Sequence, residues 1–414
     1  MFSNIMLNFK WIKKYIKSNM FLYNILFKIY YWKWTIRKFI RYRIIDREYS
    51  RNNIHLFSYH EYGESSKVSF QSPQLIDNYI MNEINFYVGK TYNIPKSFFN
   101  VFQNVNLVGP EAVGVTFNNE IILETVNGNI GLLNKCSPSQ FNNPNKLEID
   151  YKLDCAVSLV TPYNNSKRKN YLHWMTEGLL LLEAVEYYSS KYGIKPKIII
   201  NNNPTDYQID SLNMLGYLDN DIIKWKYKRV KVSNLIVPAL RSIMNDWHKI
   251  ISPGAINWLR NKLLKNCYDN YELNRFSDRV FISRDKPYDR KVLNIHEISY
   301  LLNEFGFKEY FLEKMKFKDQ IFLFNNARTI IGAHGAGLAN IMFSSMTDVI
   351  ELFGKPPERY TEYYRIANSL GLNYNFVKCQ HSFENYQNEP YHTYRKHDLI
   401  VNPHQLQITL DSLS

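Results

Sequence analysis

A short stretch of glycines has the spacing of a backbone that lies close to an anion. The stretch is ARTIIGAHGAGLANIMF at residues 327–343, where an apolar run ends at Gly332 and a helical pattern begins after Gly335 and Gly337. Glycine permits a tight turn against a ligand, and the N–H groups at a helix start attract negative charge. The stretch has neither a Gly-Lys-Ser/Thr ending nor G-x-G-x-x-G spacing. We therefore predict a diphosphate site; the alternative is glycines that serve only strand-to-helix packing.

Two arginines that precede this loop could reach the same anion. Arg284 directly follows an apolar run at 279–283, and Arg290 comes shortly after it. Because the carboxyl ends of parallel strands meet at one edge of a sheet, Arg284 should lie at the edge where the glycine loop lies. A forked guanidinium suits paired contacts with phosphate oxygens. We expect Arg284 and Arg290 to bind the anion, with Lys291 as a weaker candidate and a solvated basic loop as the alternative.

A third stretch, KNYLHWMTEGLLLLEA at residues 169–184, places an imidazole and a carboxylate together. His173 and Glu177 are four residues apart, so they share one face of the expected helix. Either group could act as a general base that takes a proton from a hydroxyl. The spacing does not distinguish between them, and a purely structural His–Glu pair is the alternative.

No pattern in the sequence indicates a metal site. The four cysteines are widely separated and the ten histidines include no H-E-x-x-H, so we expect buried thiols in a reducing compartment. Asp219 and Asp221 form a D-x-D pattern, which can hold a divalent ion. They lie in a polar turn, however, where such residues are common. We therefore expect neither a metal nor a cofactor.

Helical and strand-like patterns alternate along the chain after residue 170, which is typical of a layered α/β fold. The alternation is interrupted near residues 252–254, so we expect two Rossmann-like lobes that face a cleft. Turn-rich sequence before residue 170 contains strand-like runs at 113–117 and 120–126. The expected helices cover 171–189, 206–215, 255–267, 296–305, 317–326 and 336–344, and the expected strands cover 197–200, 230–237, 279–283, 328–332 and 348–353.

The positive charge of the chain is concentrated at its N-terminus. Residues 1–51 contain 12 Lys and Arg against 2 acidic residues, which is +10 of the total of +13. The nearly neutral remainder argues against a protein that coats nucleic acid. The uncharged stretch at 18–27 is too short to span a bilayer, which needs about 20 residues, and no signal-peptide cleavage pattern follows it. We expect a basic amphipathic helical segment on an anionic membrane surface, or else helices packed on the body.

The ordered set of these motifs resembles glycosyltransferase family 61. The family pattern is an N-x-x-H-W helix followed by I-S-R, R-x-x-x-N, G-x-H-G-A-G-L-x-N-x-x-F and V-I-E. The resemblance covers about residues 150–375 and departs at 344–347, where relatives usually carry a Pro-Gly turn. The matching positions are Asn170, His173 and Trp174; Ile282, Ser283 and Arg284; Arg290 and Asn294; Gly332 to Leu338 with Asn340 and Phe343; and Val349, Ile350 and Glu351.

The resemblance implies a GT-B-like fold, a nucleotide-sugar donor held by the C-terminal lobe, and an inverting transfer that needs no metal. On the family pattern the arginine and the glycine loop would bind the diphosphate, and Glu351 would lie near the nucleoside. The pattern does not assign the base, so His173 and Glu177 both remain candidates. The expected binding residues are Arg284, Arg290, His334, Gly335, Ala336, Gly337, Leu338, Asn340 and Glu351.

We therefore expect a hexosyl- or pentosyltransferase that acts on a hydroxyl of a glycan or lipid-linked acceptor. The composition and the missing signal peptide favour a bacterial enzyme of capsule or lipopolysaccharide synthesis, peripheral at the cytoplasmic face of the inner membrane. The alternative is a non-catalytic nucleotide- or glycan-binding protein attached through its N-terminus. The expected parts are the basic segment 1–51, an acceptor-side lobe 52–250, a donor lobe 251–375 and a tail 376–414 packed on the body.

Overall fold

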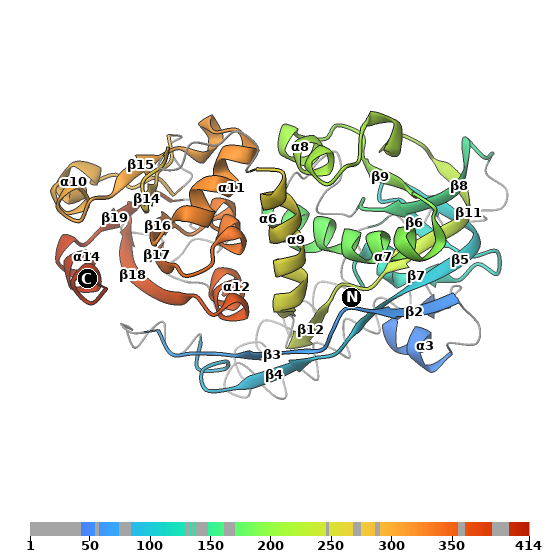
Figure 1. Ribbon diagram of the computed structural model, residues 1–414, viewed down its shortest axis with the longest axis horizontal. Coiled ribbons are helices and arrows are strands. Elements are labelled where there is room, and N and C mark those ends of the chain that lie inside the picture. Colours follow the sequence, from blue (N-terminus) through green and yellow to red (C-terminus); the bar gives the residue numbers. More distant parts are fainter. Residues whose placement is uncertain are drawn as a thin grey trace, which may run out of the picture.

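The structure, a computed structural model, combines helices and several sheets (Figure 1), and it confirms the predicted α/β class. The predicted basic segment lies outside the described residues except for 43–51. The structure describes residues 43–53, 58–73, 84–128, 133, 136, 148–160, 170–245, 248–267, 275–285, 290–354, 361–382 and 397–413.

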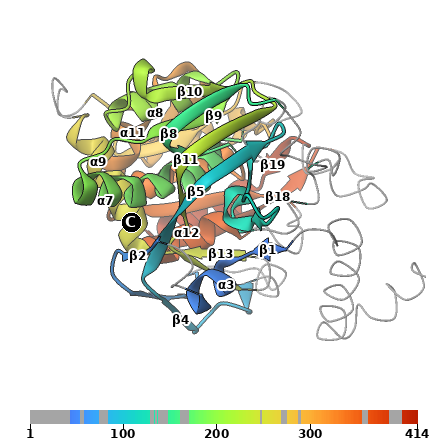
Figure 2. The same ribbon diagram turned by 90° about the vertical axis from the view of Figure 1, so that its right-hand side faces the viewer.

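A mixed sheet occupies the N-terminal half of the molecule (Figure 2). In spatial order its strands are β1 (Ile44–Ile45), β7 (Ile121–Ile122), β6 (Val113–Val115), β5 (Ser97–Val108), β11 (Arg229–Pro238), β8 (Tyr151–Ser158), β9 (Lys197–Asn201) and β10 (Ile222–Trp225), and β2 (Ser58–Tyr62) also pairs with β5. The long strand β5 runs antiparallel to β11, whereas β11, β8, β9 and β10 are parallel to one another. This half therefore contains a parallel unit extended by antiparallel strands.

A second sheet occupies the C-terminal half. In spatial order its strands are β15 (Lys308–Tyr310), β14 (Arg279–Ile282), β16 (Thr329–Ala333), β17 (Asp348–Phe353), β18 (Asn373–His381) and β19 (Leu399–Val401). All neighbouring pairs are parallel except β18 with β19. Every residue of β16 is buried, as expected for a parallel strand covered on both faces. The strands predicted at 279–283, 328–332 and 348–353 are confirmed, and their carboxyl ends share one edge.

Helices cover these sheets, and α9 lies between the two halves in Figure 1. The strands β12 (Ser242–Asn245) and β13 (His248–Ile251) form an antiparallel pair that leads into α9. The predicted interruption at 252–254 is the start of α9, with Pro253 at its first position, where proline is favoured. The helices are α3 (Arg47–Asn52), α7 (Leu182–Tyr192), α8 (Asp206–Met214), α9 (Pro253–Lys265), α10 (Ile295–Glu304), α11 (Phe317–Asn326), α12 (Glu362–Leu370) and α14 (Pro403–Asp411).

Two expected helices have a different geometry from the α-helix predicted. The segment at 171–189 begins as α6 (Tyr171–His173), continues as a π-helical turn at Trp174–Gly178 and a 3₁₀ turn at Leu179–Leu181, and then becomes α7. The Trp174 ring packs closely against Gly178 at the end of the π-helical turn, since a β-carbon at position 178 would lie only 3.2 Å from that ring. The segment at Ala336–Phe343 is a 3₁₀ helix.

The strand predicted at 120–126 is wrong in its second half. Strand β7 ends at Ile122, and Leu123–Val126 forms a 3₁₀ turn. Asn127 follows with a left-handed φ of 58°, a conformation that asparagine adopts more readily than most residues. This turn directs the Asn127 side chain to the candidate site described below.

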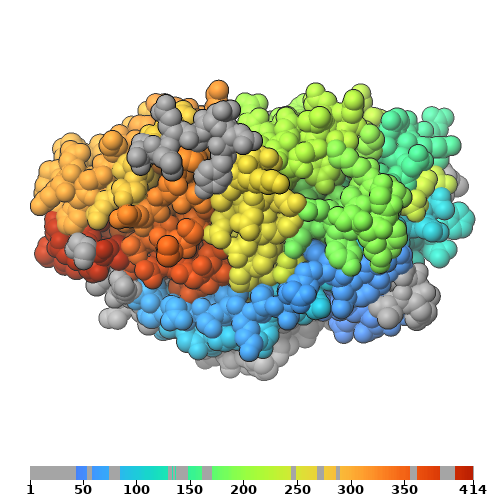
Figure 3. All heavy atoms as spheres, viewed as in Figure 1, coloured from blue at the N-terminus to red at the C-terminus, as the bar shows by residue number. Residues whose placement is uncertain are grey.

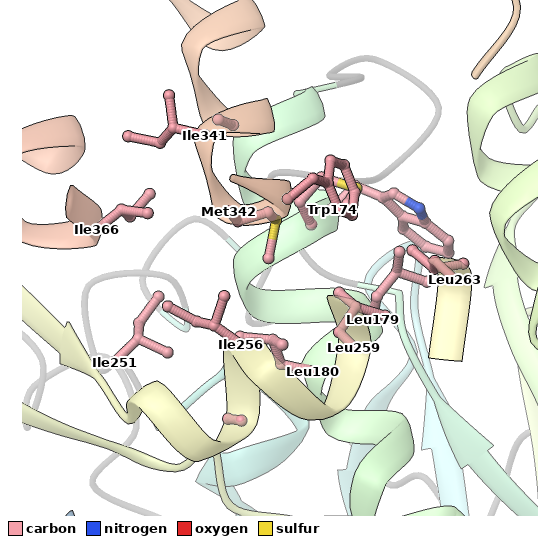
Figure 4. Close-up of a cluster of buried hydrophobic side chains, with 14 of the residues drawn as sticks. Trp174, Leu179, Leu180, Ile251, Ile256, Leu259, Leu263, Ile341, Met342 and Ile366 are labelled. Carbon is pink, nitrogen blue, oxygen red and sulfur yellow. The ribbon is translucent and has the colours of Figure 1, made fainter. Parts of the chain in front are cut away.

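A single hydrophobic core joins the two halves. It includes Ile198 of β9 and Ile330 of β16, and it is continued between them by side chains of α9 such as Leu259. Figure 4 shows the central part, where Leu180 lies beside Ile256 and Leu259 of α9. The two halves therefore share one buried interior.

An extended segment also connects the halves. Strands β3 (Ser66–Ser69) and β4 (Thr91–Ile94) pair antiparallel, and the chain after β3 reaches α12. The Gln71 amide donates to Oδ1 of Asn368 at 2.7 Å, and the Tyr364 hydroxyl donates to the Gln71 carbonyl at 2.6 Å. In Figure 3 this segment, coloured blue, runs along the lower edge of both halves.

The two ends of the described chain pack on the body. Arg47 of α3 donates to the carbonyls of Ser242 at 3.1 Å and Leu240 at 3.2 Å. At the other end β19 extends the C-terminal sheet, and α14 contributes Leu406 to a core beside it. None of the helices in the described part of the chain is long and apolar enough to cross a membrane.

Candidate functional site

The carboxyl edge of the C-terminal sheet brings two arginines against the glycine loop. Arg284 follows β14 and Gly335 follows β16, which is the neighbouring strand. A β-carbon at Gly335 would overlap the Arg284 guanidinium and would lie 3.2 Å from Nη2 of Arg290. A side chain at position 335 would therefore displace the Arg284 guanidinium, which lies directly against the glycine backbone. Arg284, Arg290 and Gly335, all predicted as anion-binding residues, lie together.

Arg290 has an unusual backbone conformation at this position. Its φ is 63°, in the left-handed region that residues with a β-carbon seldom adopt. Such conformations cost about 1–3 kcal/mol and are found most often at functional sites, where the surrounding structure maintains them. The conformation places the Arg290 guanidinium beside Gly335.

His334, the residue before Gly335, is held by a buried carboxylate. Its Nδ1 is hydrogen-bonded to Oε1 of Glu351, and the Tyr374 hydroxyl donates to Oε2 of the same carboxylate. Glu351 is 1% exposed. The imidazole contacts the rings of Phe353, with centroids 4.5 Å apart, and Tyr363, with centroids 5.2 Å apart. Two aromatic rings and a carboxylate thus fix the plane of His334.

Tyr363 of α12 lies within this group of charges. Burial raises the pKa of its hydroxyl well above the ordinary value, Glu362 and Glu351 raise it further, and Arg290 and Arg284 oppose the change. The phenol is therefore neutral. The sequence carried no signal for Tyr363 or Tyr374, because both belong to apolar-patterned elements where tyrosine is an ordinary core residue.

The remaining loop residues divide into an outer and an inner set. Ala336 and Gly337 are partly exposed at the start of the 3₁₀ helix, next to Gly335. Leu338 is buried against Gly332, with 3.1 Å between its Cδ2 and the position of a β-carbon there. Asn340 is fully buried, donates to Oε1 of Gln320 at 3.0 Å, and accepts from the Tyr171 hydroxyl. Leu338 and Asn340 thus face the protein interior, unlike the arginines.

His173 and Glu177 form the second group, and two further residues join them. His173 Nδ1 lies 3.1 Å from Oε2 of Glu177, and Lys249 Nζ of β13 lies 3.1 Å from Oε1. Asn127 donates from Nδ2 to Oε2 at 2.8 Å. The π-helical turn carries Glu177, and such turns often occur at functional sites. Sequence reasoning missed Asn127 and Lys249, because each lies far from Glu177 in the chain and neither belongs to a motif.

The surroundings of Glu177 determine its charge. Burial alone would raise the pKa of its carboxyl, but Lys249 and His173 outweigh that effect through their charges and hydrogen bonds. They hold the pKa well below the ordinary carboxyl range. Glu177 is therefore an ionised carboxylate at neutral pH. Because its partners stabilise the negative charge, it is a weak proton acceptor.

The two groups are connected through α12 and through α6. Arg365 of α12 donates from Nη1 to the Lys249 carbonyl, and Tyr363 lies two residues earlier on the same helix. Tyr171 of α6 donates to Asn340 of the 3₁₀ helix. The base candidates and the anion-site candidates are thus parts of one continuous structure.

The candidate D-x-D motif forms a structural turn. Asp221 accepts from Lys195 Nζ at 2.5 Å and from the Leu218 amide at 3.1 Å. Over the part of the chain that the structure describes, no group of three or more His, Cys, Asp or Glu side chains could hold a metal ion. The expectation that the protein needs no metal stays a prediction.

The order of these elements is also the order of motifs in a known family. Residues 171–350 match the family model Glycosyltransferase 61. The match confirms the resemblance predicted from the sequence. No curated protein matches the chain.

The family 61 region begins at α6 and ends within β17. It contains both base candidates, Lys249, the two arginines and the glycine loop, and it stops one residue before Glu351. The family implies glycosyltransferase activity, so a nucleotide-sugar donor and a glycan acceptor are the substrates to expect.

Proposed function

We propose that this protein is an inverting, metal-independent glycosyltransferase that moves a sugar from a nucleotide sugar to a hydroxyl of a glycan or lipid-linked acceptor. The observation that carries the proposal is the convergence of Arg284 and Arg290 on Gly335 at the carboxyl edge of a parallel sheet. Open α/β sheets bind ligands at this edge. Two guanidinium groups against a glycine backbone suit the two negative charges of a diphosphate.

His173 is the proposed general base. Glu177 has the lowered pKa of a neutralised carboxylate, so its proposed role is to orient His173 through Nδ1. A carboxylate that holds an imidazole in one orientation is a recurring device in nucleophile activation. His173 then accepts the proton of the acceptor hydroxyl at Nε2.

The bond changes of the proposed step balance. The acceptor O–H bond breaks as its proton passes to His173, and the oxygen bonds to the anomeric carbon from the face opposite the diphosphate. The bond from that carbon to the diphosphate oxygen breaks, and its electron pair leaves with the diphosphate. The arginines stabilise the charge that develops there. One displacement inverts the anomeric configuration.

The proposal includes a GT-B-like arrangement, with residues 52–250 on the acceptor side and 251–375 on the donor side. It also includes attachment of residues 1–51 to the cytoplasmic face of an anionic membrane, in surface polysaccharide synthesis. The charge of +10 in that segment supports it. Binding of the full chain to anionic vesicles, compared with a chain that begins at residue 43, tests the attachment; equal binding would exclude it.

A screen of nucleotide sugars tests the activity. The purified protein is incubated with each donor and a set of glycan acceptors in the presence of EDTA, and released nucleoside diphosphate is measured. Donor-dependent release that His173→Ala abolishes supports the proposal. Donor binding by calorimetry without release would instead indicate a non-catalytic nucleotide-binding protein.

A further inference from the structure

Two neighbouring strands of the C-terminal sheet, and the residue that follows a third strand beside them, contribute side chains to a hydrogen-bonded row. Tyr374 lies in β18, Glu351 lies in β17, and His334 directly follows β16. Tyr374 is level with Val349, two residues before Glu351 on β17, and His334 extends two residues past Gly332, which is level with Glu351. Alternate residues share one face of a sheet. The hydrogen-bonded row Tyr374–Glu351–His334 thus crosses one face of the C-terminal sheet diagonally, toward the carboxyl edge of that sheet.

Both oxygens of the Glu351 carboxylate accept hydrogen bonds in this row. Oε1 receives Nδ1 of His334, and Oε2 receives the Tyr374 hydroxyl. Burial raises the pKa of the Tyr374 hydroxyl well above the ordinary value, and the Glu351 charge adds to the effect, so Tyr374 keeps the proton that it donates to the carboxylate. Among the described residues, His334 is the one basic side chain paired with Glu351. A buried carboxylate needs such partners, because an uncompensated buried charge is strongly unfavourable.

His334 lies at the end of this hydrogen-bonded row that is nearest to the proposed diphosphate site. The next residue, Gly335, is the one against which Arg284 and Arg290 pack, so the imidazole borders the proposed diphosphate site. Its plane is fixed by Phe353 and Tyr363. Since Nδ1 is bound to Glu351, Nε2 is the nitrogen that the ring presents to a ligand.

We propose that Glu351 and Tyr374 are positioning residues for His334, which, as an imidazolium paired with Glu351, donates from Nε2 to an oxygen of the leaving diphosphate. The inference rests on the proposed function. It assigns Glu351 a role through the imidazole, in place of the nucleoside contact that the family resemblance implied. Tyr374 lies outside the region matched by the family, and nothing in the motifs pointed to it.

Binding of inorganic pyrophosphate, measured by calorimetry, tests the proposal. We expect Tyr374→Phe to weaken binding about 3–10-fold, the effect of one lost hydrogen bond, and Glu351→Gln to weaken it about as much as His334→Asn. The matched control is Tyr364→Phe, since the Tyr364 hydroxyl bonds to the Gln71 carbonyl and not to Glu351. This control should bind pyrophosphate as the wild type does.

Two readouts separate positioning from a general structural effect. In the His334→Asn background, Glu351→Gln should cause no further loss of affinity, because the carboxylate acts only through the imidazole. In proton NMR spectra, the Nδ1 proton of His334, assigned by its absence in His334→Asn, should move upfield in Glu351→Gln and stay in place in Tyr364→Phe.

Several results would overturn the inference. Additive losses in the double variant, or equal losses in Tyr364→Phe and Tyr374→Phe, would exclude positioning. If Arg284→Ala abolishes pyrophosphate binding while Glu351→Gln and Tyr374→Phe bind normally, the inference fails and the proposed donor site stands. If Arg284→Ala also binds normally, the donor site itself is wrong. Should Glu351→Gln not fold, Tyr374→Phe alone decides.

Discussion

The contacts of Glu177 separate the roles of the two base candidates, Glu177 and His173, which their spacing in the sequence could not distinguish. Glu177 accepts a hydrogen bond from Asn127 and lies 3.1 Å from both His173 Nδ1 and Lys249 Nζ, and its lowered pKa makes it a poor base. His173 is half-buried next to it, and a neutral imidazole has a ring nitrogen that can accept a proton. The negative charge of Glu177 favours the protonated form of the His173 imidazole, whereas the positive charge of Lys249 disfavours it.

This opposition predicts two opposite shifts in the pH profile of turnover. Glu177→Gln removes a negative charge beside His173, which disfavours the protonated imidazole, so the acid limb of kcat should move to lower pH. Lys249→Met removes a positive charge, so the acid limb should move to higher pH. His173→Ala should lower kcat by about 10²–10⁴-fold with donor affinity little changed. Shifts of the same sign in the first two variants would contradict the assignment.

Gly335 gives a second prediction at the scale of a residue. Gly335→Ala places a methyl group where the Arg284 guanidinium lies, so the arginine must move away from the loop. We expect pyrophosphate affinity to fall at least 10-fold while the thermal midpoint changes little, because the displaced group is partly exposed. The control is Arg279→Ala, which removes an arginine at the opposite end of β14 and so measures how far pyrophosphate affinity depends on net charge alone. Normal affinity in Gly335→Ala would exclude a close approach of the anion to this loop.

The elements of the C-terminal half were predictable because their sequences are locally consistent. Strand β16 is a buried run that includes Gly332 and is followed by Gly335 and Gly337, and parallel pairing then brings Arg284 to Gly335. The π-helical turn was not predictable, because its residues have the same apolar spacing as an α-helix. Lys249 and Tyr374 were missed for another reason: their contacts depend on how β13 and β18 pack against distant segments, which no local pattern encodes.

Glu177 joins three elements, so its charge predicts how stability depends on pH. Its folded-state pKa lies below the ordinary value of 4.5, so the unfolded chain takes up the proton first as the pH falls. The stabilisation is present above 4.5 and is lost between 4.5 and the lower folded-state pKa. The excess thermal stability of the wild type over Glu177→Gln should therefore narrow between pH 7 and pH 3.

Calorimetric scans across this pH range check the prediction. The control is Glu186→Gln, which changes a partly exposed carboxylate on α7 that pairs with Lys262 and accepts from the Trp258 indole. Its difference from the wild type should stay small at every pH. A gap between the wild type and Glu177→Gln that is constant with pH would show that Glu177 is not held ionised by its neighbours.

At the scale of the whole molecule, the shared core predicts that the two halves unfold together. Leu259 of α9 is fully buried in the core that contacts both sheets. Leu259→Ala should lower the free energy of unfolding by about 2–5 kcal/mol. Native-state hydrogen exchange should then show equal losses of protection in β9 and β17. Loss confined to one sheet would show that the halves are separate folding units.

The central claim is that one site transfers a sugar from a nucleotide sugar without a metal. The most direct measurement is NMR of the product formed with the donor found in the screen, in the presence of EDTA, for the wild type, Arg284→Ala and His173→Ala. The account predicts a product of inverted anomeric configuration from the wild type, and at least 10²-fold less product from each variant. A product of retained configuration, transfer abolished by EDTA, or full activity in both variants would contradict it.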